Sequence, residues 1–340
     1  MGNVPTCAIR LASIVIFKTQ TAGYVGSRGV HLPLNWGNFD MVPPSLVTVA
    51  PDGHLLFPTT RPVPVINPKF GSIGTTQWQG WSVYRSLQVN LTQQVRYGLT
   101  LQGAYSWSKS IDIGAIEYAS NELQNSMDDP WSSNPNLNRG VSDFNTPHRL
   151  SVNLVWDAPS LHSGIVVSRF LLSGWELSGI FTAQSGAPNT VVLPIDQAGT
   201  GALVSGGAGQ FVSQRPDFKA GPGCRSPNAV NPGDPSTYYN LQCFSFPKLG
   251  ELGNLGRNTL RGPGLENVDF SLFKNHNLLG EKLKVQFRAE FFNLFNRPNF
   301  GTQRVTPFNN LGQTVPAAAA ILPPTATTSR QIQFGMKFVW

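Results

Sequence analysis

The residues of this chain that could carry acid–base chemistry are few and widely spaced. His148 and Arg149 lie close to Asp143, and a His/Asp pair can move a proton in some enzymes. No nucleophile is spaced to act with this pair, so we interpret Pro147-His148-Arg149 as the start of a strand after a loop. The five histidines of the chain are scattered without metal-ligand spacing. We therefore expect no enzyme, and no catalytic, cofactor-binding or metal-binding residue.

A second group of charges alternates along one segment near the C-terminus. Lys282, Lys284, Arg288 and Glu290 occupy even-numbered positions of an otherwise apolar run. An extended chain places such residues on one face. On the inner wall of a barrel they could line the path of a solute, or they could form a ladder of opposite charges that neutralise one another. Both interpretations predict side chains that face a lumen.

The chain also contains three cysteines. Cys7 stands alone, whereas Cys224 and Cys243 share one segment rich in Gly, Pro and Asn. No Cys-x-x-Cys or Cys/His spacing indicates zinc. In an exported loop Cys224 and Cys243 could form a disulfide, and two free thiols are the alternative.

The elements that must position these residues are β-strands. Between Tyr97 and Lys109, for example, apolar residues fill every second position and Thr, Gln, Ala and Ser fill the others. A helix needs apolar spacing near 3.6 residues, which none of these segments shows. We predict about eight strands. The alternating segments are Leu87–Thr92, Tyr97–Lys109, Leu150–Trp156, Trp175–Thr182, Val268–Leu272, Lys282–Phe291 and Gln331–Trp340, with a weaker one near Ala12–Val25.

Strand length and aromatic placement separate the two environments that such alternation permits. A soluble sandwich turns its apolar faces to a core, and a membrane barrel turns its apolar face to lipid and its polar face to a watery lumen. Several segments reach the ~9–11 residues that a tilted strand needs to cross a bilayer. Aromatic residues stand near their ends, as in an interfacial girdle. Those residues are Tyr97, Tyr105, Trp107, Trp156, Trp175, Phe291 and Trp340.

Long and short connections alternate along the chain, as in a barrel with periplasmic turns and long extracellular loops. The chain then ends on a strand in which Ile332, Phe334, Met336, Phe338 and Trp340 alternate with mainly polar residues. In a closed barrel this strand pairs with the first one, and its end lies on the periplasmic side. The predicted connections are Arg28–Gly80, Val95–Gly98, Ile111–Pro147, Ala158–Arg169, Gly186–Gly264, His276–Glu281 and Arg297–Ser329.

Composition agrees with a β protein of the membrane. Charged residues make up 13% of the chain, about half the usual share of a soluble protein, and no apolar run has the ~20 residues of a transmembrane helix. The net charge of +7 comes from Lys and Arg that are scattered singly, so we expect no nucleic-acid partner. We interpret the charge as dispersed and solubilising. Contact with phosphates of an outer-leaflet lipid is the alternative.

Several motifs resemble one family of surface proteins. From about residue 22 onward the chain is similar to the C-terminal barrel portion of TonB-dependent outer-membrane receptors of the Oar-like group. The matching segments are Tyr24–His31, Ser142–Arg149, Leu172–Phe181, Gly253–Gly264, Val268–Lys274, Arg288–Phe300 and the terminal aromatic strand.

This resemblance implies an antiparallel transmembrane β-barrel of ~22 strands with a plug, placed in the bacterial outer membrane among its lipids. About eight strands make only part of such a barrel, so we expect a fragment that lacks the plug domain. We predict an atypical N-terminal segment at 1–21 and the receptor barrel portion at 22–340. Phe334, Phe338 and Trp340 are the expected signal to the barrel-assembly machinery. The energy-coupling TonB complex is an expected partner only if a plug is supplied.

Three functions follow from these observations. The first is a receptor or transporter barrel that recognises a ligand and imports it with TonB coupling. The second is a surface adhesion or structural barrel whose long loops do the work. The third is a soluble all-β carbohydrate-binding protein. The sequence does not name a ligand, because loops carry no readable specificity code.

Overall fold

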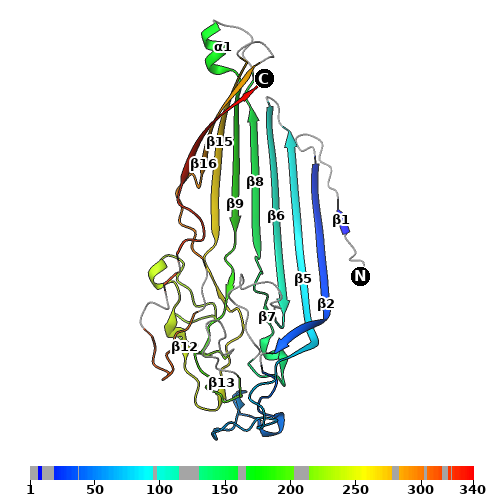
Figure 1. The fold of residues 1–340 in the computed structure, drawn as a ribbon, viewed down its shortest axis with the longest axis vertical. Coiled ribbons are helices and arrows are strands. Elements are labelled where there is room, and N and C mark those ends of the chain that lie inside the picture. Colours follow the sequence, from blue (N-terminus) through cyan, green and yellow to red (C-terminus); the bar gives the residue numbers. More distant parts are fainter. Residues whose placement is uncertain are drawn as a thin grey trace.

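The computed structural model gives the chain one long, twisted antiparallel sheet with packed loops at one end (Figure 1). The structure describes residues 7–9, 19–36, 38–94, 98–114, 130–159, 166–202, 214–277, 283–301, 305–315, 321–322 and 324–340. No helix in these ranges is long and apolar enough to cross a membrane.

Within the described residues, eight of the strands that build the sheet are long, which confirms the expected number. Every neighbouring pair is antiparallel, and strands that are successive along the chain lie side by side. The strands are β2 (Thr19–Trp36), β5 (Thr75–Gln94), β6 (Leu99–Asp112), β8 (His148–Asp157), β9 (Trp175–Gln184), β15 (Leu265–Asn277), β16 (Lys284–Phe292) and β17 (Gln331–Val339).

The first long strand lies further along the chain than the sequence predicted. A strand was expected at Ala12–Val25, whereas β2 runs from Thr19 to Trp36 and residues 11–18 lie outside the described ranges. The alternation breaks after Val30 because the register with β5 shifts between Val30 and Leu34, where His31 has φ +52°. A local irregularity of this kind is a β-bulge, and pairing with β5 carries the strand across it.

The sheet is open within the described residues. The short strand β1 (Cys7–Ile9) pairs with β2 at one edge, and β17 forms the other edge, where it pairs with β16. The pairing of β17 with the first strand, which the sequence predicted only for a closed barrel, is not formed by the described residues. Closing a sheet into a barrel links strand number, tilt and register, and the expectation of a partial barrel is confirmed.

The connections segregate by length as the sequence predicted. All four long ones gather at one end of the sheet, and the C-terminus lies at the other end with helix α1 (Val166–Leu172), as Figure 1 shows. The expected short connection Ala158–Arg169 is longer than predicted because it contains α1 and continues to Gly174, whose φ is +78°. Trp340 therefore belongs to the end with the short connections.

We call the described residues of the four long connections, between 38 and 74, 113 and 147, 185 and 264, and 293 and 330, the loop cap. The loop cap contains short strands and 3-10 turns. Its strands are β3 (Thr48–Val49), β4 (Leu55–Leu56), β7 (Gly140–Val141), β10 (Pro188–Asn189), β11 (Asp217–Phe218), β12 (Phe244–Ser245), β13 (Glu251–Leu252) and β14 (Leu260–Arg261). The 3-10 turns are Pro44–Leu46, Pro135–Asn138, Pro235–Thr237 and Leu241–Cys243.

Candidate functional site

The pairing register gathers the apolar residues of the eight strands on one face of the sheet. Directly opposed residues of antiparallel strands share a face. In one such row Leu91 faces Gly103, which faces Val152, and Val152 faces Phe181. In another, Leu154 faces Gly179. We call this surface the apolar face. Many of its side chains are exposed, among them Leu87, Val89, Tyr105, Trp107, Leu154, Phe287, Ile332, Phe334, Met336 and Phe338.

A face of this kind is unusual for a protein in water, because large contiguous apolar surfaces mark contact with lipid or another protein. Trp107 is at the level of Ser185, just after β9 ends at the loop cap, and Trp175 lies ten residues earlier, at the other end of β9. Ten residues at ~3.3 Å each make about 33 Å along the strand. A barrel tilt of ~40° reduces this to about 25 Å of height, the thickness of the apolar band of outer-membrane barrels. The aromatic residues thus border a band of membrane thickness.

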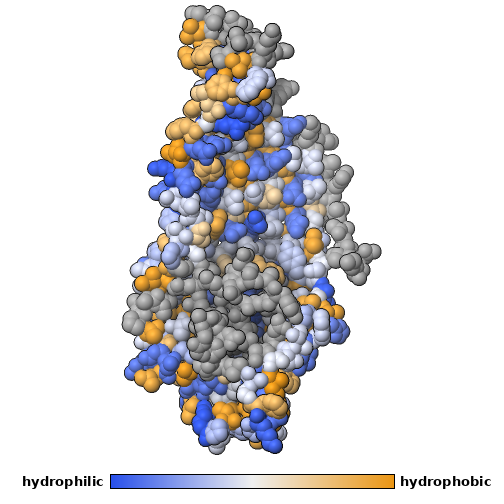
Figure 2. Space-filling view, viewed as in Figure 1, coloured by the Kyte–Doolittle hydropathy of each residue, from blue (hydrophilic) through white to orange (hydrophobic). Residues whose placement is uncertain are grey.

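Helix α1 continues the apolar surface at the end with the short connections. Its side chains Val167, Phe170, Leu171 and Leu172 are 50–62% exposed, and Figure 2 shows hydrophobic residues gathered at this end of the molecule. The indole of Trp175 donates to the carbonyl of Leu171 at 2.7 Å. This contact places α1 beside Trp175, at the aromatic border away from the loop cap, where a membrane interface would lie.

The opposite face of the sheet is polar and carries the predicted lumen charges. Arg288 opposes Phe273 and Gly335, and Glu290 opposes Ser271 and Gln333. Lys284 lies on this face at the start of β16, and Lys282 falls outside the described residues. That these side chains face a lumen stays a prediction.

Among the described residues, Lys284, Arg288 and Glu290 form no ion pair, and the ladder of neutralising charges stays a prediction. Arg288 donates to Gln286 at 2.7 Å, and its guanidinium lies over the Phe273 ring at 5.5 Å. Arg288 and Glu290 lie two residues apart on one strand, so each side chain contacts the residues directly opposite it on the neighbouring strands. Arg288 thus has a cation–π contact on this face.

On the C-terminal strand, Phe334 and Phe338 belong to the apolar face, where Phe334 stacks with Phe287 at 6.1 Å between ring centroids. Trp340 is 93% exposed just after the strand. Their role in assembly stays a prediction.

Two hydrophobic clusters bind the four loops of the cap into one unit. The first joins three connections through Val42, Phe57, Trp131 and Leu252, with Trp131 edge-on to Phe57 at 5.3 Å. The second joins the last two connections, and all its members are buried. They include Val191, Leu193, Tyr238, Tyr239, Phe244, Leu255, Leu260, Val305 and Phe308. Sequence reasoning treated these segments as polar loops, because their apolar residues follow no period.

Cys224 and Cys243 form a disulfide inside the second cluster, with Cα atoms 5.3 Å apart. The sequence left this pair open between a disulfide and free thiols. The bond closes a segment with a sequence separation of 19, which restricts the unfolded loop and so stabilises the folded one.

Buried arginines fix the cap to the end of the sheet. Arg257 is 4% exposed and forms ion pairs with Asp112 at the end of β6 and with Asp143, the latter at 3.3 Å. It also donates to the carbonyl of Asn138 at 2.9 Å. Sequence reasoning missed Arg257, since its two partners lie more than a hundred residues earlier in the chain. A buried cation with two carboxylates makes this contact specific in geometry.

Asp143 forms its ion pair with Arg257. His148 instead contacts Tyr105, with its Nδ1 atom 2.8 Å from the phenol oxygen. The two residues considered for proton transfer thus have separate partners, and His148 begins β8 as predicted. Within the described ranges no three His, Cys, Asp or Glu side chains group as a metal site would require.

A histidine clasp joins two connections of the cap. His54 lies between Asp52 and Asp217, with each ring nitrogen 3.0 Å from a carboxylate oxygen. The hydrogen bond with Asp52 is the largest of the causes that raise the pKa of His54 above its ordinary value. Burial opposes the rise, and Asp217 adds to it. Protonation of His54 therefore strengthens the contact between the two loops.

Together, these features define an integral β protein of the outer membrane: a sheet with an apolar band of membrane thickness and loops folded over one end. Residues 18–333 match the family described as outer membrane beta barrel domain. The chain belongs to this family and lies in the bacterial outer membrane. The comparison with curated proteins gives no match.

Proposed function

We propose that this chain is the barrel part of an outer-membrane receptor that recognises a ligand with its loop cap and takes part in TonB-coupled uptake. The packed cap is the single observation that carries the proposal. Two buried clusters, a disulfide and the Arg257 ion pairs give the cap a defined surface. Binding residues are commonly held on loops by a rigid scaffold, and a pre-ordered surface loses less entropy when a ligand binds.

The outer surface of the cap supplies candidate contact residues. Phe70, Leu249, Phe295 and Leu311 are 55–81% exposed although each is large and apolar. Single exposed apolar residues are ordinary on any protein. On a cap at the extracellular end of a barrel, however, they are the side chains that a partly apolar ligand would meet first.

Two partners complete the proposal. The terminal strand β17, with its exposed Phe334 and Phe338, is the segment that the barrel-assembly machinery would engage, since a free strand edge pairs readily with another strand. The energy-coupling complex would act through a plug domain, and its involvement rests on the family resemblance of the sequence motifs.

A growth competition tests the receptor. Cells that express the chain compete with cells that carry Leu249→Ser, Phe295→Ser and Leu311→Ser together, on media in which one iron chelate or one oligosaccharide is limiting. The proposal expects the triple variant to lose its advantage on at least one medium, and expects the same loss for the unchanged protein in a strain without the energy-coupling complex. Lys337→Gln, on the sheet, is the control that should compete normally.

Surface adhesion is the second candidate, because the cap would serve it equally well. In that case the triple variant weakens attachment of cells to a surface, and removal of the energy-coupling complex leaves both growth and attachment unchanged. That combination of results would support the adhesin and contradict the receptor. The soluble carbohydrate-binding interpretation is set aside, since the family places the chain in the membrane.

A further inference from the structure

Three cations that lie as far apart in the sequence as Arg28 and Lys109 come together on the apolar face next to the cap. Arg85 of β5 directly opposes Lys109 of β6 on one side and Gly26 of β2 on the other. Arg28 stands two residues beyond Gly26 and opposes Val83. Because opposed residues share a face, Arg28, Arg85 and Lys109 all project from the apolar side. We call these three residues the basic cluster.

The cluster has no acidic counterpart to explain it. No ion pair or hydrogen bond joins the side chains of Arg28, Arg85 or Lys109 to any other described residue, and all three are exposed. Like charges directly opposed on neighbouring strands destabilise a sheet. Beside a surface that meets hydrocarbon, these unpaired cations also lose part of their hydration. An anion from outside the chain would relieve both costs.

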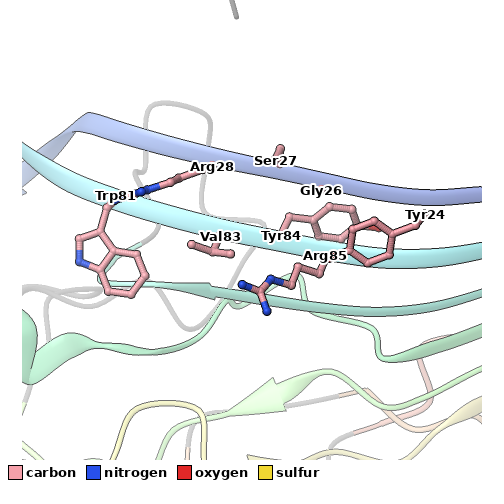
Figure 3. A pocket seen from close by; sticks show the side chains of 8 residues that line it. All are labelled: Tyr24, Gly26, Ser27, Arg28, Trp81, Val83, Tyr84 and Arg85. Carbon is pink, nitrogen blue, oxygen red and sulfur yellow. The ribbon is translucent and has the colours of Figure 1, made fainter. Parts of the chain in front are cut away.

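The local shape offers such an anion room. A hollow of about 580 Å³ is lined by Tyr24, Gly26, Ser27, Arg28, Trp81, Val83, Tyr84 and Arg85. Gly26 lies between Tyr24 and Arg28 on β2 and has no side chain to fill the hollow. The ring of Tyr24 lies 3.6 Å from the position that a Cβ of Gly26 would take. Figure 3 shows the Arg85 side chain and the Trp81 ring projecting from the same side of β5. The hollow thus has guanidinium groups at its wall and aromatic rings at its borders.

The height of the hollow in the membrane identifies the kind of anion. Arg85 and Lys109 lie two residues toward the cap from the row of Leu87 and Trp107, which is the outer aromatic border of the apolar band. Two residues of a tilted strand correspond to about 5 Å of height, the level at which lipid headgroups begin. Arg139 is a further cation near one lining residue, with its guanidinium 6.0 Å from the centroid of the Trp81 ring.

We propose that the basic cluster binds the phosphorylated headgroup of an outer-leaflet glycolipid, whose acyl chains lie along the apolar face below it. Guanidinium groups match phosphate oxygens in pairs of parallel hydrogen bonds, and clustered cations at a membrane surface recognise anionic headgroups. The adjoining apolar rows, with Leu87, Val89 and Tyr105 exposed, give the acyl chains their surface. One ligand thereby satisfies the charges and covers the apolar side chains.

Binding of lipid A tests this site on the purified full chain in non-ionic detergent, with retention of lipid measured by native mass spectrometry. Arg28→Ala combined with Arg85→Ala removes two cations from the site. Lys284→Ala combined with Lys337→Ala removes two cations from the polar face and is the matched control. Heat-modifiable electrophoretic mobility reports whether each variant is folded, and Arg28→Lys with Arg85→Lys keeps the charge if the alanine variant fails to fold.

The site predicts that the double alanine variant binds bisphosphorylated lipid A at least about tenfold more weakly than the unchanged protein, because each lost charge-assisted contact is worth roughly that factor. The lysine variant should fall between the two, and the control should bind normally. Equal binding by the alanine variant, or equal binding of dephosphorylated lipid A by the unchanged protein, overturns the proposal. Displacement of the lipid by millimolar inorganic phosphate would also overturn it, because the site would then be a small-anion site.

Discussion

Replacing Leu154 by arginine tests which face of the sheet meets lipid. Leu154 is 38% exposed near the middle of β8, between Leu101 and Gly179 on the apolar face. It lies six residues from the row of Trp107 and four from the level of Trp175, so it is close to the membrane midplane. An arginine on the lipid face at that depth costs about 2–4 kcal/mol. A loss of that size is a large part of the stability of an ordinary domain.

Asn153 supplies the matched control, since it is the next residue along the strand and belongs to the polar face opposite Gln102 and Ile180. Asn153→Arg should cost less than about 1 kcal/mol, because a polar face tolerates charge. Both variants are folded into phospholipid vesicles, and the heat-modifiable fraction is followed through a urea titration. Equal costs for the two variants, or a greater cost for Asn153→Arg, would refute the assignment of the faces.

Three further predictions concern the loop cap. Arg257→Met should destabilise the cap by about 3–5 kcal/mol, because it leaves two buried carboxylates without a counter-charge; hydrogen exchange in residues 130–147 would show the loss. Cys224→Ser should lower the stability of the second cluster by about 3 kcal/mol, as expected for a closed loop of this length, measured by thermal unfolding with and without reductant. The His54 clasp should be stronger in acid. Since the folded pKa of His54 is raised, its contribution is complete below the unfolded value of ~6.5 and is lost as the pH rises through the folded pKa. Proteolysis of residues 50–57 should therefore be faster at pH 8.5 than at pH 5.5, and His54→Gln should remove the difference.

Each of these has its own control. For Arg257, replacing its two aspartate partners by Asn in the same chain should restore much of the loss, and a triple variant no more stable than the single one would contradict the ion-pair argument. Reductant should have no effect on the Cys224→Ser variant. A proteolysis rate that keeps its pH dependence in His54→Gln would assign that dependence to another group.

The fold shows how far local pattern reaches in a β protein of the membrane. The segments between Tyr97 and Lys109 and between Gln331 and Trp340 were recognised because lipid on one side and water on the other impose a period of two on every residue. The same reasoning failed at β2, where a bulge interrupts the period near His31. It also missed α1, whose seven residues are too few to show a helical period.

Much less of the candidate site could be predicted from the sequence. A cap core has no period, so Phe57, Trp131 and Leu252 looked like isolated residues of polar loops until contact joined them. The Gly-rich segment that begins at Gly199 has no periodic pattern either. Where it is described it is held in place, because the Asp196 carboxylate accepts hydrogen bonds from the backbone of Gly199, Thr200 and Gly201.

The sequence by itself determined the strands, their apolar and polar faces, the alternation of short and long connections and the end of the sheet at which the chain stops. All of these follow from neighbours a few residues apart and from the two solvents that the strands separate. Only the tertiary structure decided which loops pack together, that Arg257 holds Asp112 and Asp143, and that Arg28, Arg85 and Lys109 form one basic cluster. Those contacts depend on register and loop closure between distant segments, and the order of residues along the chain does not display either.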